Sequence, residues 1–140
     1  MNYFNILSDK LLSELPVSLE FCYVYDTQEE SVNLLMHDHH PYDKKYIYHS
    51  KELDQIMHEI SLFQIMISQH QKLLGALQCI ACTFDKTKVI AFPLKNAVLI
   101  LAFDKRKLHS MTAAEYDLLI RRLQHIISEC GLTPEDGGSY

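Results

Sequence analysis

The segment between His37 and Asp43 contains the residue types best suited to chemistry in this sequence. His37, His39, His40 and Asp43 bring three imidazoles and a carboxylate close together, and these groups are common ligands of Zn²⁺ and related ions. A metal site also needs ligands that surrounding groups hold rigidly, so a solvated loop is the simpler interpretation. A third interpretation is a pH-responsive loop, because clustered histidines gain charge between about pH 7 and 5.5.

Cys79 and Cys82 have the Cys-x-x-Cys spacing of redox pairs. Such pairs lie at a helix N-terminus, which lowers the thiol pKa. Here the pair falls within an expected strand, where residues three apart face opposite sides, so we expect a packing role. The other cysteines, Cys22 and Cys130, follow no regular spacing, and nothing signals export. Reduced thiols and a cytoplasmic location are therefore the expectation.

The remaining candidates for catalysis do not combine into a site. No histidine has a Ser or Cys partner at a recognisable spacing. The four glycines, at positions 75, 131, 137 and 138, do not form a phosphate-binding loop. The sequence therefore predicts no enzyme, no catalytic residues and no cofactor.

Composition and charge restrict the classes of partner. The chain has 140 residues, of which 48% are hydrophobic, and this fits one globular domain with a real core. We expect that domain over residues 1–132 and a disordered tail over 133–140. The net charge is −5 and the cations are not clustered, which disfavours nucleic acid. No stretch approaches the roughly 20 apolar residues of a membrane span, so no membrane insertion is expected.

Hydrophobic periodicity predicts an α+β fold with the order α-ββ-α-βββ-α. The predicted elements are a helix over 3–15, strands over 18–26 and 31–36, an irregular loop over 37–49, a helix over 50–74, strands over 77–84, 88–93 and 97–103, and a helix over 112–131. Pro16 and Gly75 are expected to end the first two helices. Thr112 and Glu115 have the spacing of a capping box.

The long middle helix is apolar nearly all round in its centre. One broad face, expected to cover the sheet, carries Leu53, Ile56, Met57, Ile60, Phe63, Ile67 and Leu74. Leu62, Met66 and Leu73 cluster on the opposite side, with Ile65 between the two faces. This second face must be covered by the terminal helices, by the 37–49 loop, or by a subunit or partner. We favour a subunit or partner, since apolar patches of this kind mark interfaces.

Residues 81–103, ACTFDKTKVIAFPLKNAVLILAF, resemble the strands and turns of the roadblock/LC7 (profilin-like) domain family. The order of the other elements is also similar over roughly residues 3–130. The resemblance implies a five-stranded antiparallel sheet, with the long helix on one face and the terminal helices on the other. It also implies a dimer through the long helix and the neighbouring edge strand, which here places Leu62, Ile65, Met66, Leu73 and Cys79 in the interface.

Three functional hypotheses follow. Roadblock-like proteins bind Ras-like small GTPases, dynein parts or related complexes, and this implies a non-catalytic scaffold that pairs with itself or with a related roadblock-like chain. The sequence departs from the family in its first hairpin, over 27–30, and in its histidine-rich 37–49 segment. A small acidic secretion chaperone or adaptor is the second hypothesis, and a metal-binding protein that uses the His37–Asp43 loop is the third.

Overall fold

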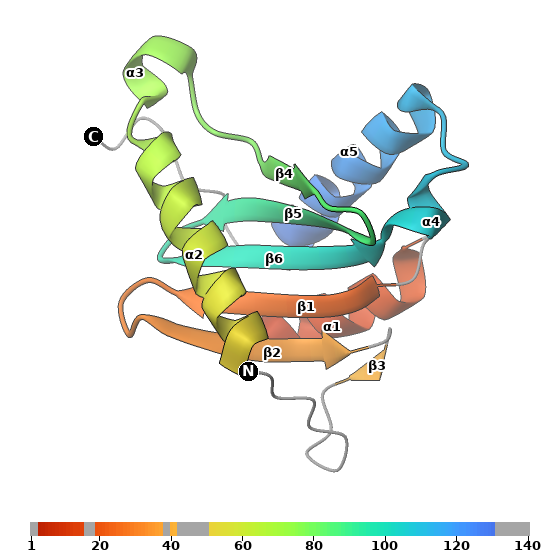
Figure 1. Ribbon diagram of the computed structural model, residues 1–140, viewed down its shortest axis with the longest axis horizontal. Coiled ribbons are helices and arrows are strands. Elements are labelled where there is room, and N and C mark those ends of the chain that lie inside the picture. Colours follow the sequence, from red (N-terminus) through yellow and green to blue (C-terminus); the bar gives the residue numbers. More distant parts are fainter. Residues whose placement is uncertain (1–2, 16–18, 38–39, 42–50, 131–140) are drawn as a thin grey trace.

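A computed structural model describes residues 3–15, 19–37, 40–41 and 51–130 (Figure 1). Its elements are α1 (Tyr3–Glu14), β1 (Leu19–Asp26), β2 (Ser31–His37), β3 (His40–Pro41), α2 (Lys51–Ser68), α3 (Gln71–Leu74), β4 (Ile80–Thr83), β5 (Thr87–Leu94), β6 (Ala97–Asp104), α4 (Lys105–Leu108) and α5 (Ala113–Glu129). The α+β prediction is confirmed. The predicted tail, 133–140, lies outside the described residues.

The strands form one antiparallel sheet in the order β3-β2-β1-β6-β5-β4. The five main strands are those that the sequence predicts. The sixth, β3, has two residues and pairs with the end of β2, His40 opposite His37 and Pro41 opposite Met36. The prediction of an irregular loop over 37–49 is therefore wrong for His37, His40 and Pro41. The other residues of that segment lie outside the described ranges.

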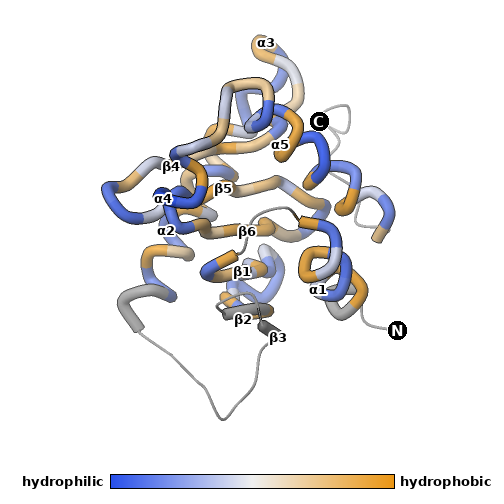
Figure 2. The backbone as a smooth tube through the Cα atoms, turned by 90° about the vertical axis from the view of Figure 1, so that its right-hand side faces the viewer, coloured by the Kyte–Doolittle hydropathy of each residue, from blue (hydrophilic) through white to orange (hydrophobic). Residues whose placement is uncertain are grey.

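The sheet separates two helical layers, as the resemblance implies. Figure 2 shows α2 on one side of the sheet and α1 and α5 on the other. The layer under α1 and α5 holds the larger buried cluster, which includes Leu11, Phe92, Leu101 and Leu123. The layer under α2 holds a smaller one, formed largely by the sheet itself.

A β-bulge in β1 puts Leu19 and Phe21, two residues apart, on opposite faces of the sheet. Its register against β6 shifts between Leu19 and Phe21, because Glu20 is an extra residue in that pairing. After the shift, Cys22 joins the cluster under α1 and α5, whereas Tyr23 joins the cluster under α2. Cys22 and Tyr23 follow the ordinary alternation of a strand, and β1 is buried on both faces.

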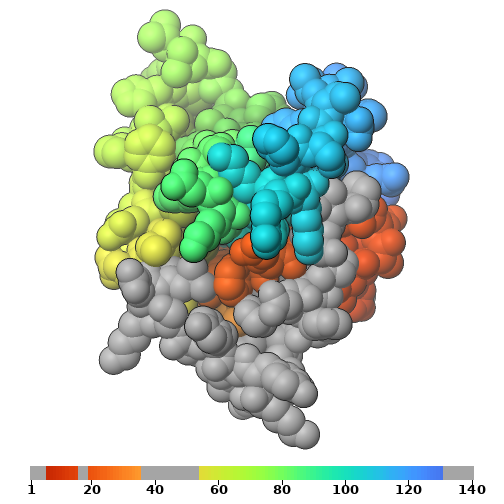
Figure 3. All heavy atoms as spheres, turned by 45° about the vertical axis from the view of Figure 1, so that its right-hand side comes forward, coloured from red at the N-terminus to blue at the C-terminus, as the bar shows by residue number. Residues whose placement is uncertain are grey.

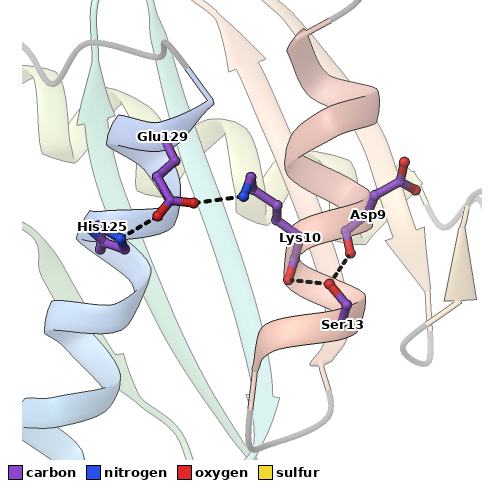
Figure 4. A network of polar contacts seen from close by, with 5 residues as sticks. All are labelled: Asp9, Lys10, Ser13, His125 and Glu129. Atoms are coloured by element: carbon purple, nitrogen blue, oxygen red, sulfur yellow. Dashed lines mark hydrogen bonds and ion pairs between the residues drawn. The ribbon is translucent and has the colours of Figure 1, made fainter.

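Polar contacts tie the two helices of the larger layer together (Figure 4). Lys10 Nζ of α1 donates a hydrogen bond of 2.7 Å to Glu129 Oε2 of α5. His125 Nε2 pairs with the other carboxylate oxygen. The hydrogen bond from Lys10 holds the pKa of Glu129 below its ordinary value, with the charge of His125 a smaller contribution.

The predicted helix over 50–74 is interrupted. The hydroxyl of Ser68 donates to the carbonyl of Ile65 at 2.7 Å, an oxygen that Gln69 N–H would contact in a continuing helix. The Gln69 N–H instead bonds to Met66 O, and His70 N–H bonds to Ile67 O. This tighter spacing ends α2, and the short α3 follows. Gly75 closes α3 with a φ of 87°, as expected for a helix stop.

Two further features differ from the sequence prediction, and the start of α5 agrees with it. The strand predicted over 77–84 is shorter, since β4 has four residues. Helix α4 was not predicted; Asp104 caps it by accepting a 2.9 Å hydrogen bond from Arg106 N–H. The predicted N-cap of α5 is confirmed, because the Thr112 hydroxyl accepts from the N–H of Glu115 and donates to the Glu115 carboxylate.

Candidate interaction surface

Helix α2 turns its more polar side toward the sheet. The residues buried on this side are Met57, Ser61, Gln64 and Ser68, which follow one another at helical spacing. The sheet surface beneath them carries small side chains, among them Ala91 and Ala102. Small residues on both surfaces allow the helix to lie close to the sheet.

The two serines satisfy their own hydroxyls. Ser61 Oγ donates to Met57 O at 2.8 Å, and Ser68 Oγ donates to Ile65 O. Gln64 differs, because its side chain is 1% exposed and its amide nitrogen has no hydrogen-bond partner. A buried polar group without a partner destabilises the folded chain.

A buried tyrosine lies in the same layer between α2 and the sheet. Tyr23 of β1 is almost fully buried, and its hydroxyl also has no hydrogen-bond partner. Burial, with a smaller contribution from the negative charge of Asp54, raises the pKa of Tyr23 to about 12. Its neighbour Tyr25 meets the imidazole of His58 edge to face, with ring centroids 5.1 Å apart. The two tyrosines of β1 thus contribute to the apolar layer under the helix.

The opposite side of α2 leaves large apolar side chains in solvent. The exposed fraction is 47% for Leu62, 47% for Phe63 and 54% for Met66, and Ile56 is exposed as well. We call these four residues the outer face of α2. Sequence reasoning assigned Ile56 and Phe63 to the sheet side, and that assignment is wrong. Leu74, assigned to the same side, is also exposed.

Further apolar groups extend the outer face. Leu73 of α3 is 89% exposed, and Phe84 is half exposed after β4. A groove of about 370 Å³ lies between α2 and the β4–β5 turn, and Ile56, Met57 and Phe84 line it. Ile56 belongs to both the groove and the outer face, so the two apolar surfaces are continuous.

Strand β4 adds an open edge to the same region. Within the described residues it pairs with β5 alone. An unpaired strand edge offers backbone N–H and C=O groups to another chain. It therefore supplies a polar element beside the apolar outer face.

The five predicted interface residues do not lie on one surface. Leu62, Met66 and Leu73 are exposed. Ile65 packs partly against the cluster under α2, and Cys79 packs against the cluster under α1 and α5. Sequence reasoning included Phe84 in the edge strand of the implied dimer but did not name it among the interface residues; an aromatic residue directly before the polar turn Asp85–Lys86 was the available signal.

The Cys-x-x-Cys pair behaves as the sequence predicts. Cys82 packs against the cluster under α2, so it faces away from Cys79. All four cysteines are free. Burial raises the pKa of Cys79 and of Cys22, the opposite of what a reactive redox thiol needs.

Only two of the four predicted metal ligands lie among the described residues. His39 and Asp43 lie outside the described residues, and His37 and His40 are placed opposite each other by the backbone pairing of β2 and β3. Among the described residues no group of three or more His, Cys, Asp or Glu side chains could hold an ion. In the same part of the chain, no helix is both long and apolar enough to cross a bilayer. The metal hypothesis stays a prediction.

Comparisons with known proteins identify the fold. No family model and no curated protein matches the sequence. Among solved structures, MglB from Myxococcus xanthus is 13% identical over 91% of this chain and 86% of its own, with a TM-score of 0.54. A roadblock/LC7 domain from Streptomyces avermitilis is 12% identical over 88% of this chain and 90% of its own, also with a TM-score of 0.54.

The gliding protein MglB from Thermus thermophilus is 13% identical, with coverage of 91% and 90% and a TM-score of 0.50. At such low identities these matches establish shared architecture. The chain has the roadblock/LC7 fold, as the sequence resemblance predicts.

Proposed function

We propose that this protein is a non-catalytic dimeric scaffold that binds another protein, with the outer face of α2 and the edge of β4 as its pairing surface. One observation carries the proposal. Helix α2 buries Ser61, Gln64 and Ser68 while it exposes Leu62, Phe63 and Met66. A helix that contacts only the sheet would be expected to bury its apolar side chains and expose its polar ones.

The size of the apolar surface fits a subunit contact. Helix α2 has 18 residues and is thus about 27 Å long. Full burial of one Leu, Phe or Met side chain contributes about 1.5–3 kcal/mol. Burial of the exposed half of each outer-face side chain would contribute about 1 kcal/mol per residue, and a symmetric contact counts each residue twice.

The first test is sedimentation velocity of untagged protein over a wide concentration range. The proposal expects a dimer that dissociates only on strong dilution. A monomer at every concentration would contradict pairing with a second copy. A monomer that forms a one-to-one complex with a related roadblock-like chain would replace the homodimer with a heterodimer.

A small Ras-like GTPase is the partner class that the roadblock resemblance implies. The test loads candidate GTPases with GDP or with a non-hydrolysable GTP analogue and measures their binding to the dimer. We expect binding that depends on the nucleotide, because the switch loops of such GTPases differ between the two states. Equal or absent binding in both states would direct the search to other proteins. A cytoplasmic location belongs to the same proposal.

A further inference from the structure

A second cleft lies away from the outer face of α2. It has a volume of about 320 Å³ and lies between the β4–β5 turn, α4 and the start of α5. Figure 3 shows the β4–β5 turn (green) beside α4 (cyan) on one face of the molecule, and the hydrogen bond from Lys105 N to Lys86 O joins the two segments. The polar residues that line the cleft are Thr83, Lys88, Lys105, His109, Thr112 and Tyr116, and no lining residue is acidic.

This lining is unusual for the protein as a whole. Acidic residues outnumber Lys and Arg by 18 to 13 in the sequence, yet the cleft carries two lysines. Two of the neighbouring carboxylates are already engaged. Asp104 accepts from Arg106 Nη2 at 2.8 Å, and the carboxylate of Glu115 accepts from the Thr112 hydroxyl at 3.2 Å. Among the described residues neither lysine of the cleft forms an ion pair, so both can attract a negative group from outside the chain.

One residue that lines the cleft, Tyr116, carries a buried hydroxyl without a partner. The oxygen of Tyr116 is shielded from solvent and makes no hydrogen bond. The ammonium of Lys88 lies over the ring of this tyrosine, 4.3 Å from its centroid. The Lys88 ammonium therefore lies over the face of a ring that itself carries an unpaired hydroxyl donor. The first N–H groups of α5, a helix of 17 residues, lie beside them at Ala113.

We propose that this cleft binds a phosphate-type oxyanion, with Lys88 and Lys105 supplying charge and Tyr116 supplying a hydrogen-bond donor. Phosphate oxygens accept several charge-assisted hydrogen bonds at once. The free anion and the phosphate of a lipid headgroup share this chemistry, and the experiment separates them. The inference does not rest on dimer formation, because Lys88, Lys105 and Tyr116 belong neither to the outer face of α2 nor to β4.

The experiment titrates inorganic phosphate into ¹⁵N-labelled full-length protein at constant ionic strength and follows the amide signals. We expect saturable shifts at Lys88, Lys105 and residues 112–116. The amides around Gln78 and Gln124, which line a separate cleft of about 300 Å³ without cations, should not move. Linear shifts without saturation, or equal shifts in both clefts, would overturn the proposal.

Three variants separate a specific site from general charge. Lys88→Gln is expected to weaken phosphate binding about tenfold, or by about 1.4 kcal/mol, and Tyr116→Phe is expected to weaken it without any change in net charge. Lys72→Gln removes the same charge from exposed α3 and should leave the affinity unchanged. Equal weakening by Lys88→Gln and Lys72→Gln would overturn the proposal. Unchanged affinity of the Tyr116→Phe variant would also overturn the role of the hydroxyl.

Vesicles distinguish the two sources of phosphate. Binding to vesicles that contain a phosphoinositide, lost in Lys88→Gln and absent with neutral phosphatidylcholine, would assign the cleft to a lipid headgroup. Saturable binding of inorganic phosphate without vesicle binding would assign it to a free anion. Failure of both arms would overturn the site and leave the dimer proposal unaffected.

Discussion

Substitution of Met66 by glutamate should separate the two copies without unfolding either of them. Met66 is the most exposed residue of the outer face, at 54%. Glutamate and methionine have similar helix propensities, and an exposed substitution changes stability by about 0.5 kcal/mol or less. The isolated subunit should therefore keep its fold.

The cost to the dimer is larger. Burial of the exposed half of one methionine contributes about 1 kcal/mol, and the symmetric interface loses this twice. Two carboxylates enclosed without partners add several kcal/mol. A total of at least about 4 kcal/mol corresponds to a dissociation constant about 10³-fold weaker.

Sedimentation equilibrium measures this change, with Leu118→Glu as the matched control. Leu118 lies on α5 and is 62% exposed, so the control introduces the same charge at another exposed apolar position. The dissociation constant of the control should equal that of the wild type. Equal dissociation constants for Met66→Glu and the wild type, or equal weakening in both variants, would refute the assignment of the interface to α2.

Three further predictions concern the folded subunit. Gln64→Met removes the buried, unpartnered amide nitrogen and should raise the free energy of unfolding by about 1 kcal/mol. Urea denaturation at one fixed protein concentration measures this change, and the exposed control Gln69→Met should leave the free energy unchanged. A loss of stability in Gln64→Met would show that the amide has a partner. The pKa of Glu129 is lower in the folded chain, so its contribution to stability is present above the unfolded pKa of about 4.3 and is lost as the pH falls through the folded pKa. Unfolding midpoints of wild type and Glu129→Gln should accordingly differ at pH 7 and converge under acid, and a difference that persists under acid would contradict the lysine contact as its source. Burial raises the pKa of the Cys22 thiol, so the rate of Cys22 alkylation should equal the rate set by global unfolding. Peptide mass spectrometry measures the alkylation, and rapid labelling of the native protein would argue against this burial.

Much of the architecture could be predicted because local signals and tertiary burial agree. The strand β6 has a continuous apolar sequence and is buried on both faces, which is what such a run indicates. The start of α5 was predictable from Thr112 and Glu115, since the capping box is a local interaction. The opposite burial of Cys79 and Cys82 follows from the alternation of an extended chain.

The orientation of α2 could not be predicted from the sequence. A helix that is apolar nearly all round has no single preferred inner face. The choice depends on the sheet surface under α2, which carries small residues such as Ala91 and Ala102, whereas Phe63 stays exposed. Those partners are distant in the sequence, so periodicity carries no information about them.

The end of α2 could also not be predicted from the sequence. No Gly or Pro marks the position, and the interruption depends on the hydrogen bond from Ser68 to the carbonyl of Ile65. Serine residues make such bonds in some helices and leave others undisturbed.

Intermolecular contacts in a mixed sample test the central claim most directly. An equal mixture of isotope-labelled and unlabelled protein allows an NMR experiment that detects only proton pairs from different copies. We predict such contacts from the methyl groups of Leu62 and Met66, and none from Leu118. A dimer whose intermolecular contacts arise from α5, with none from α2, would contradict the account.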